Sequence, residues 1–108
     1  MKPLFALAIA AALLITACSG KPPQARVMNT GRDSTSVQFK AQGGNTVNIN
    51  GVAPGTASPA AEISKGGNTV TSDTKAVKDT DAITAATSKL YTAVVDSVGK
   101  MTVQEGNQ

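Results

Sequence analysis

Large apolar side chains are scarce in this chain beyond its first 18 residues. Only 15 of the 90 residues from Ser19 to Gln108 are Leu, Ile, Val or Phe. This share is below the one that usually sustains a packed globule. We therefore expect a small, largely irregular α+β fold, and the shortage argues against a large enzyme core or a membrane-spanning bundle. The chain has one cysteine, which also excludes a fold held by internal disulfides.

The first 18 residues, in contrast, have the layout of an export signal. Lys2 gives a positive start, an apolar run extends from Leu4 to Ile15, and small residues precede Cys18. The run is shorter than the ~20 apolar residues that a helix needs to cross ~30 Å of hydrocarbon. A basic start, a short apolar stretch and small residues at its end are typical of a secretory signal peptide.

The end of this leader, Ile15-Thr16-Ala17-Cys18, resembles the lipobox of bacterial lipoproteins, in which an aliphatic residue and two small residues precede an invariant cysteine. The resemblance covers the first 18 to 20 residues, with isoleucine where leucine is commonest. It implies that residues 1–17 are a signal peptide removed between Ala17 and Cys18. It also implies a covalent lipid on the Cys18 sulfur and, usually, a fatty acyl chain on the new amine.

Two or three acyl chains hold a protein firmly to a membrane, because each buried CH₂ contributes ~0.8 kcal/mol. Ser19, rather than aspartate, follows the cysteine, which resembles the family's default of export to the outer membrane. The expected location is therefore the outer membrane, with the protein lipid-anchored and facing the periplasm. The alternative is an ordinary secretory signal that leaves Cys18 as a free thiol. No cofactor is expected besides the lipid.

Residues 18–35 are typical of a flexible tether, because they contain a proline pair, several polar residues and little apolar periodicity. Positive charge beside an anchor attracts anionic lipid headgroups by about 1 kcal/mol per residue, although solvated linker charge is the simpler interpretation. Four basic residues lie in or beside this segment: Lys21, Arg26, Arg32 and Lys40.

Residues 36–50 predict a β-hairpin, because apolar and polar residues alternate on both sides of a Gly-Gly turn signal. We favour a three-residue loop at 43–45, which places Phe39 opposite Ile49 on one apolar face. A two-residue turn would set Phe39 opposite Asn48 instead, since a slip of one residue flips the face. One hairpin is marginal alone in water, so its apolar face needs a cover.

The pentapeptide Gly-Gly-Asn-Thr-Val occurs at residues 43–47 and again at residues 66–70. Two copies are fewer than a stacked repeat array needs. A second hairpin over about 62–72 would have a poor apolar face, so we expect it to be weak. Duplication and chance drift both explain the second copy, which lies in a Gly/Ser/Thr/Asn-rich region that extends over 36–75.

The last region, 76–108, predicts an amphipathic helix over about 80–98, followed by a tail. At 100° per residue its apolar side chains fall within an arc of roughly 140°. Asp79 and Asp81 are candidate helix caps and Gly99 is a candidate stop. Because threonine and valine are poor helix formers, we expect this helix to depend on burying its apolar stripe against the hairpin or another chain.

Little catalytic chemistry is available in this composition. The chain has no histidine, and its one cysteine is assigned to the anchor, so a Ser-His or Cys-His nucleophile and a His/Cys metal site are excluded. Asp73, Asp79 and Asp81 lack the spacing of a calcium loop. Phe39 and Tyr91 are too few aromatic residues for stacking on bases, so nucleic acid is not an expected partner. We expect a protein that is not an enzyme.

Three functions remain open. The first is an accessory subunit of an envelope assembly, such as a conjugation or secretion system, that binds the bilayer through acylated Cys18 and a protein partner through the helix. The second is a phage- or plasmid-encoded protein, either a spanin-like lysis lipoprotein or a surface-exclusion lipoprotein. The third is a small ligand-binding or inhibitory periplasmic module. The expected partner-binding helix face, with Tyr91 as its main contact, comprises Ile83, Leu90, Tyr91, Val94 and Val98.

Overall fold

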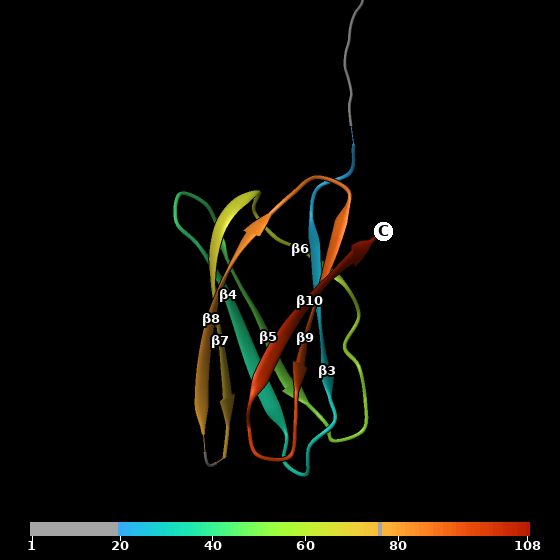
Figure 1. Cartoon of the computed structure of the whole chain (residues 1–108), viewed down its shortest axis with the longest axis vertical. Helices are drawn as coiled ribbons and strands as arrows, with labels where there is room; N and C mark the ends of the chain where they lie inside the picture. Colours follow the sequence, from blue (N-terminus) through green and yellow to red (C-terminus); the bar gives the residue numbers. More distant parts are fainter. Residues whose placement is uncertain (1–19, 76) are drawn as a thin grey trace, which may run out of the picture.

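Strands, and no helix, form the part of the chain that a computed structural model describes, residues 20–75 and 77–108 (Figure 1). None of these residues therefore belongs to a helix that could cross a membrane. The strands are β3 (Gln24–Asn29), β4 (Thr35–Ala41), β5 (Thr46–Val52), β6 (Ala61–Glu62), β7 (Gly66–Thr74), β8 (Lys78–Ala85), β9 (Lys89–Val95) and β10 (Met101–Asn107).

Two four-stranded sheets form a β-sandwich. One sheet has the order β10-β9-β3-β6 and the other the order β5-β4-β7-β8. Pairing is antiparallel except between β3 and β9, which are parallel. The expected α+β fold is therefore wrong. The predicted signal peptide 1–17 and the predicted lipidation site Cys18 lie outside the described residues.

The predicted helix over 80–98 is wrong, because this segment forms β8, a short connection and β9. Along β9 the side chains alternate in the period of two that strands require. Tyr91 and Val95 are buried between the sheets, whereas Leu90 and Val94 are half-buried on the opposite face. The chain reverses at Ser88, whose φ of 64° lies in the left-handed region.

The flexible tether predicted for 18–35 is wrong from residue 24 onward, since β3 occupies an inner position of its sheet. Ala25 and Val27 are fully buried, and Asn29 is 1% exposed. The Asn29 amide donates to the carbonyls of Asp33 at 2.7 Å and Val52 at 2.9 Å, and its oxygen accepts from the Gly31 N–H at 2.8 Å. Because the last buried position of β3 is the polar Asn29, the alternation of apolar and polar residues is too short to predict the strand from the sequence.

Strands β4 and β5 pair where the sequence predicts a hairpin, but in a register shifted by two residues. Phe39 lies opposite Val47, and Ile49 lies opposite Val37. A shift of two keeps the same side chains on one face. The backbone N–H of Gln42 donates to Gly67 O of the neighbouring strand at 3.0 Å, which fixes the end of β4.

The weak hairpin predicted for 62–72 is not formed. β6 pairs with β3, while β7 pairs with β4 and β8. The two Gly-Gly-Asn-Thr-Val copies have different structures but meet at Ser64. The Ser64 hydroxyl accepts from Asn45 N–H at 3.0 Å, and its carbonyl accepts from the Asn68 amide at 2.9 Å.

The core between the sheets is built with few large side chains. Phe39 at its centre is fully buried, and alanines allow the sheets to approach. Buried polar residues, Thr35 and Ser72 among them, occupy positions between the apolar ones. All members of the apolar core cluster lie between Ala25 and Met101, so residues 20–108 enclose a core of their own.

Candidate functional site

Three connections gather at the end of the sandwich opposite Gly20 (Figure 1). They join β3 to β4, β7 to β8 and β9 to β10. Between them is a hollow of about 120 Å³. We call this region the tip and define it by the residues that line the hollow: Arg32, Asp33, Thr74, Val77, Asp96, Ser97, Val98 and Gly99.

The tip exposes apolar surface. Val98 is 71% exposed and Val77 is 39% exposed, and these are the exposed large hydrophobic residues of the described ranges. Full burial of a valine side chain contributes roughly 1.5–3 kcal/mol. A partner that covers both valines would remove their apolar surface from water, and this burial would favour binding.

The turn that carries Val98 is held by one carboxylate. Asp96 Oδ1 accepts from the Val98 N–H at 3.0 Å and the Lys100 N–H at 2.9 Å. Gly99 has a φ of 80°, which favours glycine. A Cβ at Gly99 would lie 2.8 Å from Val77 Cβ, so glycine is what lets the two apolar turns touch. The valines are thus presented by a fixed backbone.

The five residues of the predicted helix face do not share a face. Ile83 is half-buried and packs against the core, and Tyr91 is 2% exposed between the sheets. Leu90 and Val94 are half-buried on the outer face of the β10-β9-β3-β6 sheet. Of the five, Val98 alone lies at the tip. The prediction of a single contact face on a helix is therefore wrong.

Tyr91 has a structural role rather than that of a surface contact. Its hydroxyl donates to Thr84 O at 3.0 Å and accepts from the Ala86 N–H at 2.8 Å. These bonds tie the end of β8 to the connection that leads into β9. A tyrosine that is buried with its hydroxyl satisfied contributes to stability and is not available to a partner.

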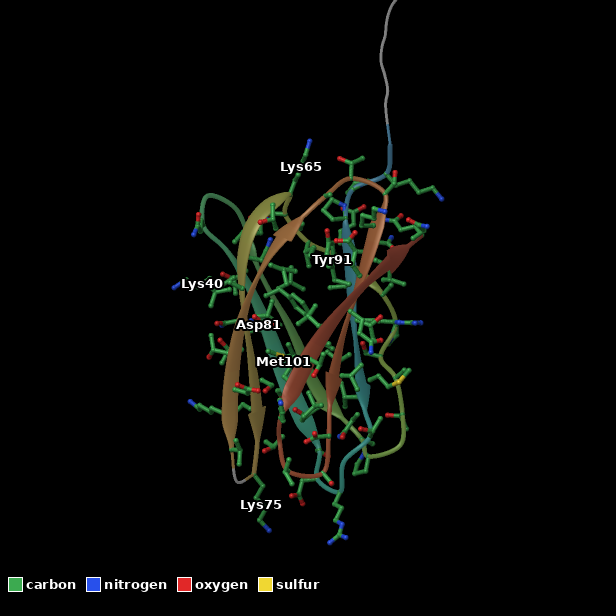
Figure 2. All side chains as sticks on the ribbon, in the orientation of Figure 1. Lys40, Lys65, Lys75, Asp81, Tyr91 and Met101 are labelled. Atoms are coloured by element: carbon green, nitrogen blue, oxygen red, sulfur yellow. The ribbon has the colours of Figure 1, made fainter. Side chains whose placement is uncertain are left out.

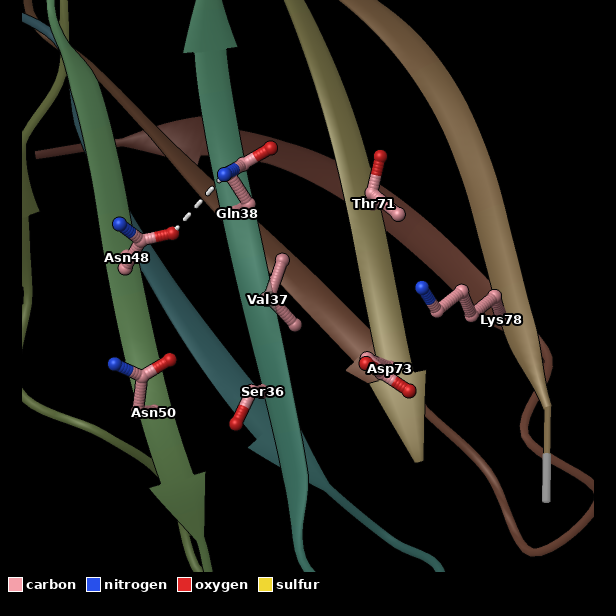
Figure 3. A pocket seen from close by; sticks show the side chains of 8 residues that line it. All are labelled: Ser36, Val37, Gln38, Asn48, Asn50, Thr71, Asp73 and Lys78. Carbon is pink, nitrogen blue, oxygen red and sulfur yellow. Dashed lines mark hydrogen bonds between the residues drawn. The ribbon is translucent and has the colours of Figure 1, made fainter. Parts of the chain in front are cut away.

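A second hollow, of about 230 Å³, lies on the outer face of the β5-β4-β7-β8 sheet. Figure 3 shows Gln38 and Asn48 joined by a 3.3 Å hydrogen bond across neighbouring strands. Most of its polar side chains are exposed to water, so hydrogen bonds to a ligand would contribute little net free energy. It is lined by Ser36, Val37, Gln38, Asn48, Asn50, Thr71, Asp73 and Lys78.

Asp79 and Asp81 do not cap a helix but protect the edge strand β8. Their Oδ1 atoms accept from the next backbone N–H, at 2.9 Å for Thr80 and 2.8 Å for Ala82. Asp79 Oδ2 also accepts from the Met101 N–H of β10 at 2.9 Å, which links the two sheets. Charged side chains on an edge strand make it a poor template for another strand. No cluster of three acidic or other metal-binding side chains occurs among the residues that the structure describes.

Most residues of the tip were not predicted from the sequence. Asp96-Ser97-Val98-Gly99 has the signature of a type I turn, with aspartate first and glycine fourth. That signal would have ended the predicted helix earlier and exposed Val98 as an apolar residue in a turn. Val77 carries no comparable signal, because its place at the tip depends on the pairing of β7 with β8.

The chain matches no protein-family model, and no curated protein is significantly similar to it. Its function is therefore inferred from the geometry of the tip, the polar hollow and the strand edges. Among these, the tip combines exposed apolar surface with a backbone held by hydrogen bonds, and it is the best candidate for a functional surface.

Proposed function

We propose that this protein is a non-enzymatic lipoprotein of the bacterial outer membrane, anchored through Cys18 and facing the periplasm. In this proposal the tip binds another protein of an envelope assembly, such as a conjugation or secretion system. One observation carries the proposal. The exposed large apolar side chains of the described residues, Val77 and Val98, stand together at the end of the sandwich opposite Gly20.

The surroundings of the valines suit a protein interface. Asp96 fixes the turn before a partner arrives, so little ordering entropy is lost on binding. Arg32 lines the same hollow, and arginine is enriched at interface hot spots. An apolar centre with charged residues around it is the usual arrangement of an interface.

The folded domain favours a partner close to the membrane. Its longest strand, β7, has nine residues and spans about 30 Å. The spanin-like alternative needs an extended chain that reaches ~200 Å across residues 19–78. Much of that segment is paired in sheets, which supports an outer-membrane assembly over a partner in the inner membrane.

Cross-linking in living cells tests the partner. A photo-reactive amino acid at position 98 is expected to capture one specific protein, and the same amino acid at exposed Lys40, far from the tip, is expected to capture none. Val77→Asp should abolish the capture from position 98 without releasing the protein from membranes. Equal capture from both positions, or capture that survives Val77→Asp, would overturn the role of the tip.

Labelling with a fatty acid tests the anchor separately. Cells fed labelled palmitate are expected to incorporate it into the wild-type protein but not into Cys18→Ser. The Cys18→Ser protein should also move from the membrane fraction to the soluble fraction. Incorporation that persists in this variant would show that the anchor is elsewhere.

A further inference from the structure

The end of the sandwich that carries Gly20 is the end nearest to the proposed anchor. We call it the base. Here Lys21 and Ser88 bind each other, with the Lys21 N–H donating to the serine hydroxyl at 3.1 Å and the Ser88 N–H donating to Lys21 O at 2.8 Å. The loop at 42–45 and the segment at 63–67 lie at the same end of the sandwich (Figure 1). There the Asn45 N–H donates to the Ser64 hydroxyl.

Only Ser19 separates Cys18 from Gly20. Two residue steps span at most about 7 Å, however the chain runs. With a lipid on Cys18, Gly20 therefore stays within reach of the headgroup region, while the rest of the base and the tip can approach or leave the surface as the domain tilts. This step rests on the proposed lipidation of Cys18, but not on the proposed role of the tip.

Lysines project from the base. Lys65 is exposed and extends away from the strands in the direction from which the chain enters the domain (Figure 2). Lys21 is exposed next to that entry. Lys89 lies nearby but forms an ion pair with Glu105 at 3.8 Å. Glu62 on β6 adds negative charge at this end. Lys21 and Lys65 form no ion pair among the described residues, so they are the groups placed to contact phosphates.

We infer that the base docks on an anionic phospholipid surface, with Lys21 and Lys65 against lipid phosphates, and that this contact holds the domain upright. Each lysine near an anionic surface shifts the ratio of docked to undocked orientations by about fivefold, which corresponds to about 1 kcal/mol. Replacing both lysines should lower the ratio by about 25-fold. Salt should lower it too, because the charges are exposed.

A spin label tests this orientation in the mature lipidated protein, reconstituted into vesicles. Once Cys18 carries its lipid the chain has no other thiol, so one introduced cysteine is a unique labelling site. Gly43→Cys labels the base, where an added Cβ meets no atom within 4 Å. Ser97→Cys labels the tip. Collision of each label with an aqueous nickel chelate reports its exposure to water.

The label at position 43 is expected to be shielded in vesicles of phosphatidylglycerol and exposed in vesicles of phosphatidylcholine. Lys21→Gln with Lys65→Gln should remove the shielding, while the matched pair Lys75→Gln with Lys100→Gln should retain it. The label at position 97 should stay exposed in both lipids. Equal exposure of position 43 in both lipids, or shielding that survives the first lysine pair, would overturn the inference. Mass spectrometry of the sample confirms lipidation, so loss of the anchor is not confused with loss of docking.

Discussion

Asp79 is the side chain whose removal most directly tests the contact between the two sheets. Asp79 and Asp81 lie on the same edge strand and make the same local bond to the following N–H, at 2.9 and 2.8 Å. Only Asp79 also accepts from the Met101 N–H of the other sheet. The two aspartates therefore form a matched pair in which the difference isolates the bond between sheets.

Hydrogen bonds to a charged group contribute about 1.5–3 kcal/mol, with the lower end expected where water competes. Asp79 is half-buried and Asp81 is exposed. Asp79→Ala is expected to lower the free energy of unfolding by about 2 kcal/mol, and Asp81→Ala by about 0.5 kcal/mol. Asp79→Asn should fall between them, because its single oxygen can accept from only one side.

Urea unfolding of residues 20–108, followed by far-ultraviolet circular dichroism, measures these changes. With a slope of about 1 kcal/mol per molar urea, Asp79→Ala lowers the midpoint by about 2 M and Asp81→Ala by about 0.5 M. Equal midpoints for the two alanine variants would refute the reasoning, since the Met101 bond would then contribute nothing. A change in slope instead of midpoint would show that the variant alters the denatured state.

Three further substitutions test buried or strained positions by thermal unfolding. Asn29→Asp should destabilise the domain more than Asn29→Ala, because a buried carboxylate would face two carbonyl oxygens. We expect Asn29→Asp to lower the free energy of unfolding by more than about 3 kcal/mol. A loss no greater than that of the alanine variant would contradict the bonding pattern. Tyr91→Phe should cost about 1–2 kcal/mol through two lost hydrogen bonds, and an unchanged melting temperature would show that the hydroxyl contributes nothing. Gly99→Ala should lower the free energy of unfolding by more than about 1 kcal/mol, because Gly99 has a φ of 80° and an added Cβ would lie close to Val77. Gly43→Ala should be near neutral, because an added Cβ there meets no atom within 4 Å. Similar losses of stability for both variants would refute this account.

Alternation of apolar and polar residues was sufficient to locate β4 and β5, because both strands are bounded by glycine and bury one face. Their register did not follow from the alternation, because registers that differ by two residues bury the same side chains. The error was two residues, the smallest shift that leaves the buried face unchanged.

The segment from β8 to β9 was mistaken for a helix because its reversal carries no glycine or proline. Residues 86–88 are Ala-Thr-Ser, and Ser88 adopts a left-handed φ that favours glycine or asparagine in most proteins. The valines and threonines along 80–98 favoured strands by intrinsic propensity. The helix was predicted from the apolar residues at helical spacing instead. In the structure these residues come from both faces of β9.

The candidate site was predictable only in part. Val98 was singled out as a partner contact, and it is the most exposed large hydrophobic residue of the described ranges. Its neighbours at the tip come from three connections distant in sequence, which pattern analysis cannot bring together. The anchor at Cys18 stays a prediction from the lipobox resemblance.

The parallel pairing of β3 with β9 has a consequence for how the chain folds. β3 is the first strand of the described residues, yet its register runs from Gln24 opposite Leu90 to Asn29 opposite Val95. Pairings between distant segments form late, because loop closure must precede them. β3 therefore gains this partner only after most of the described residues have been synthesised. The β10-β9-β3-β6 sheet is completed late for this reason, whereas the β5-β4-β7-β8 sheet can form without the pairing.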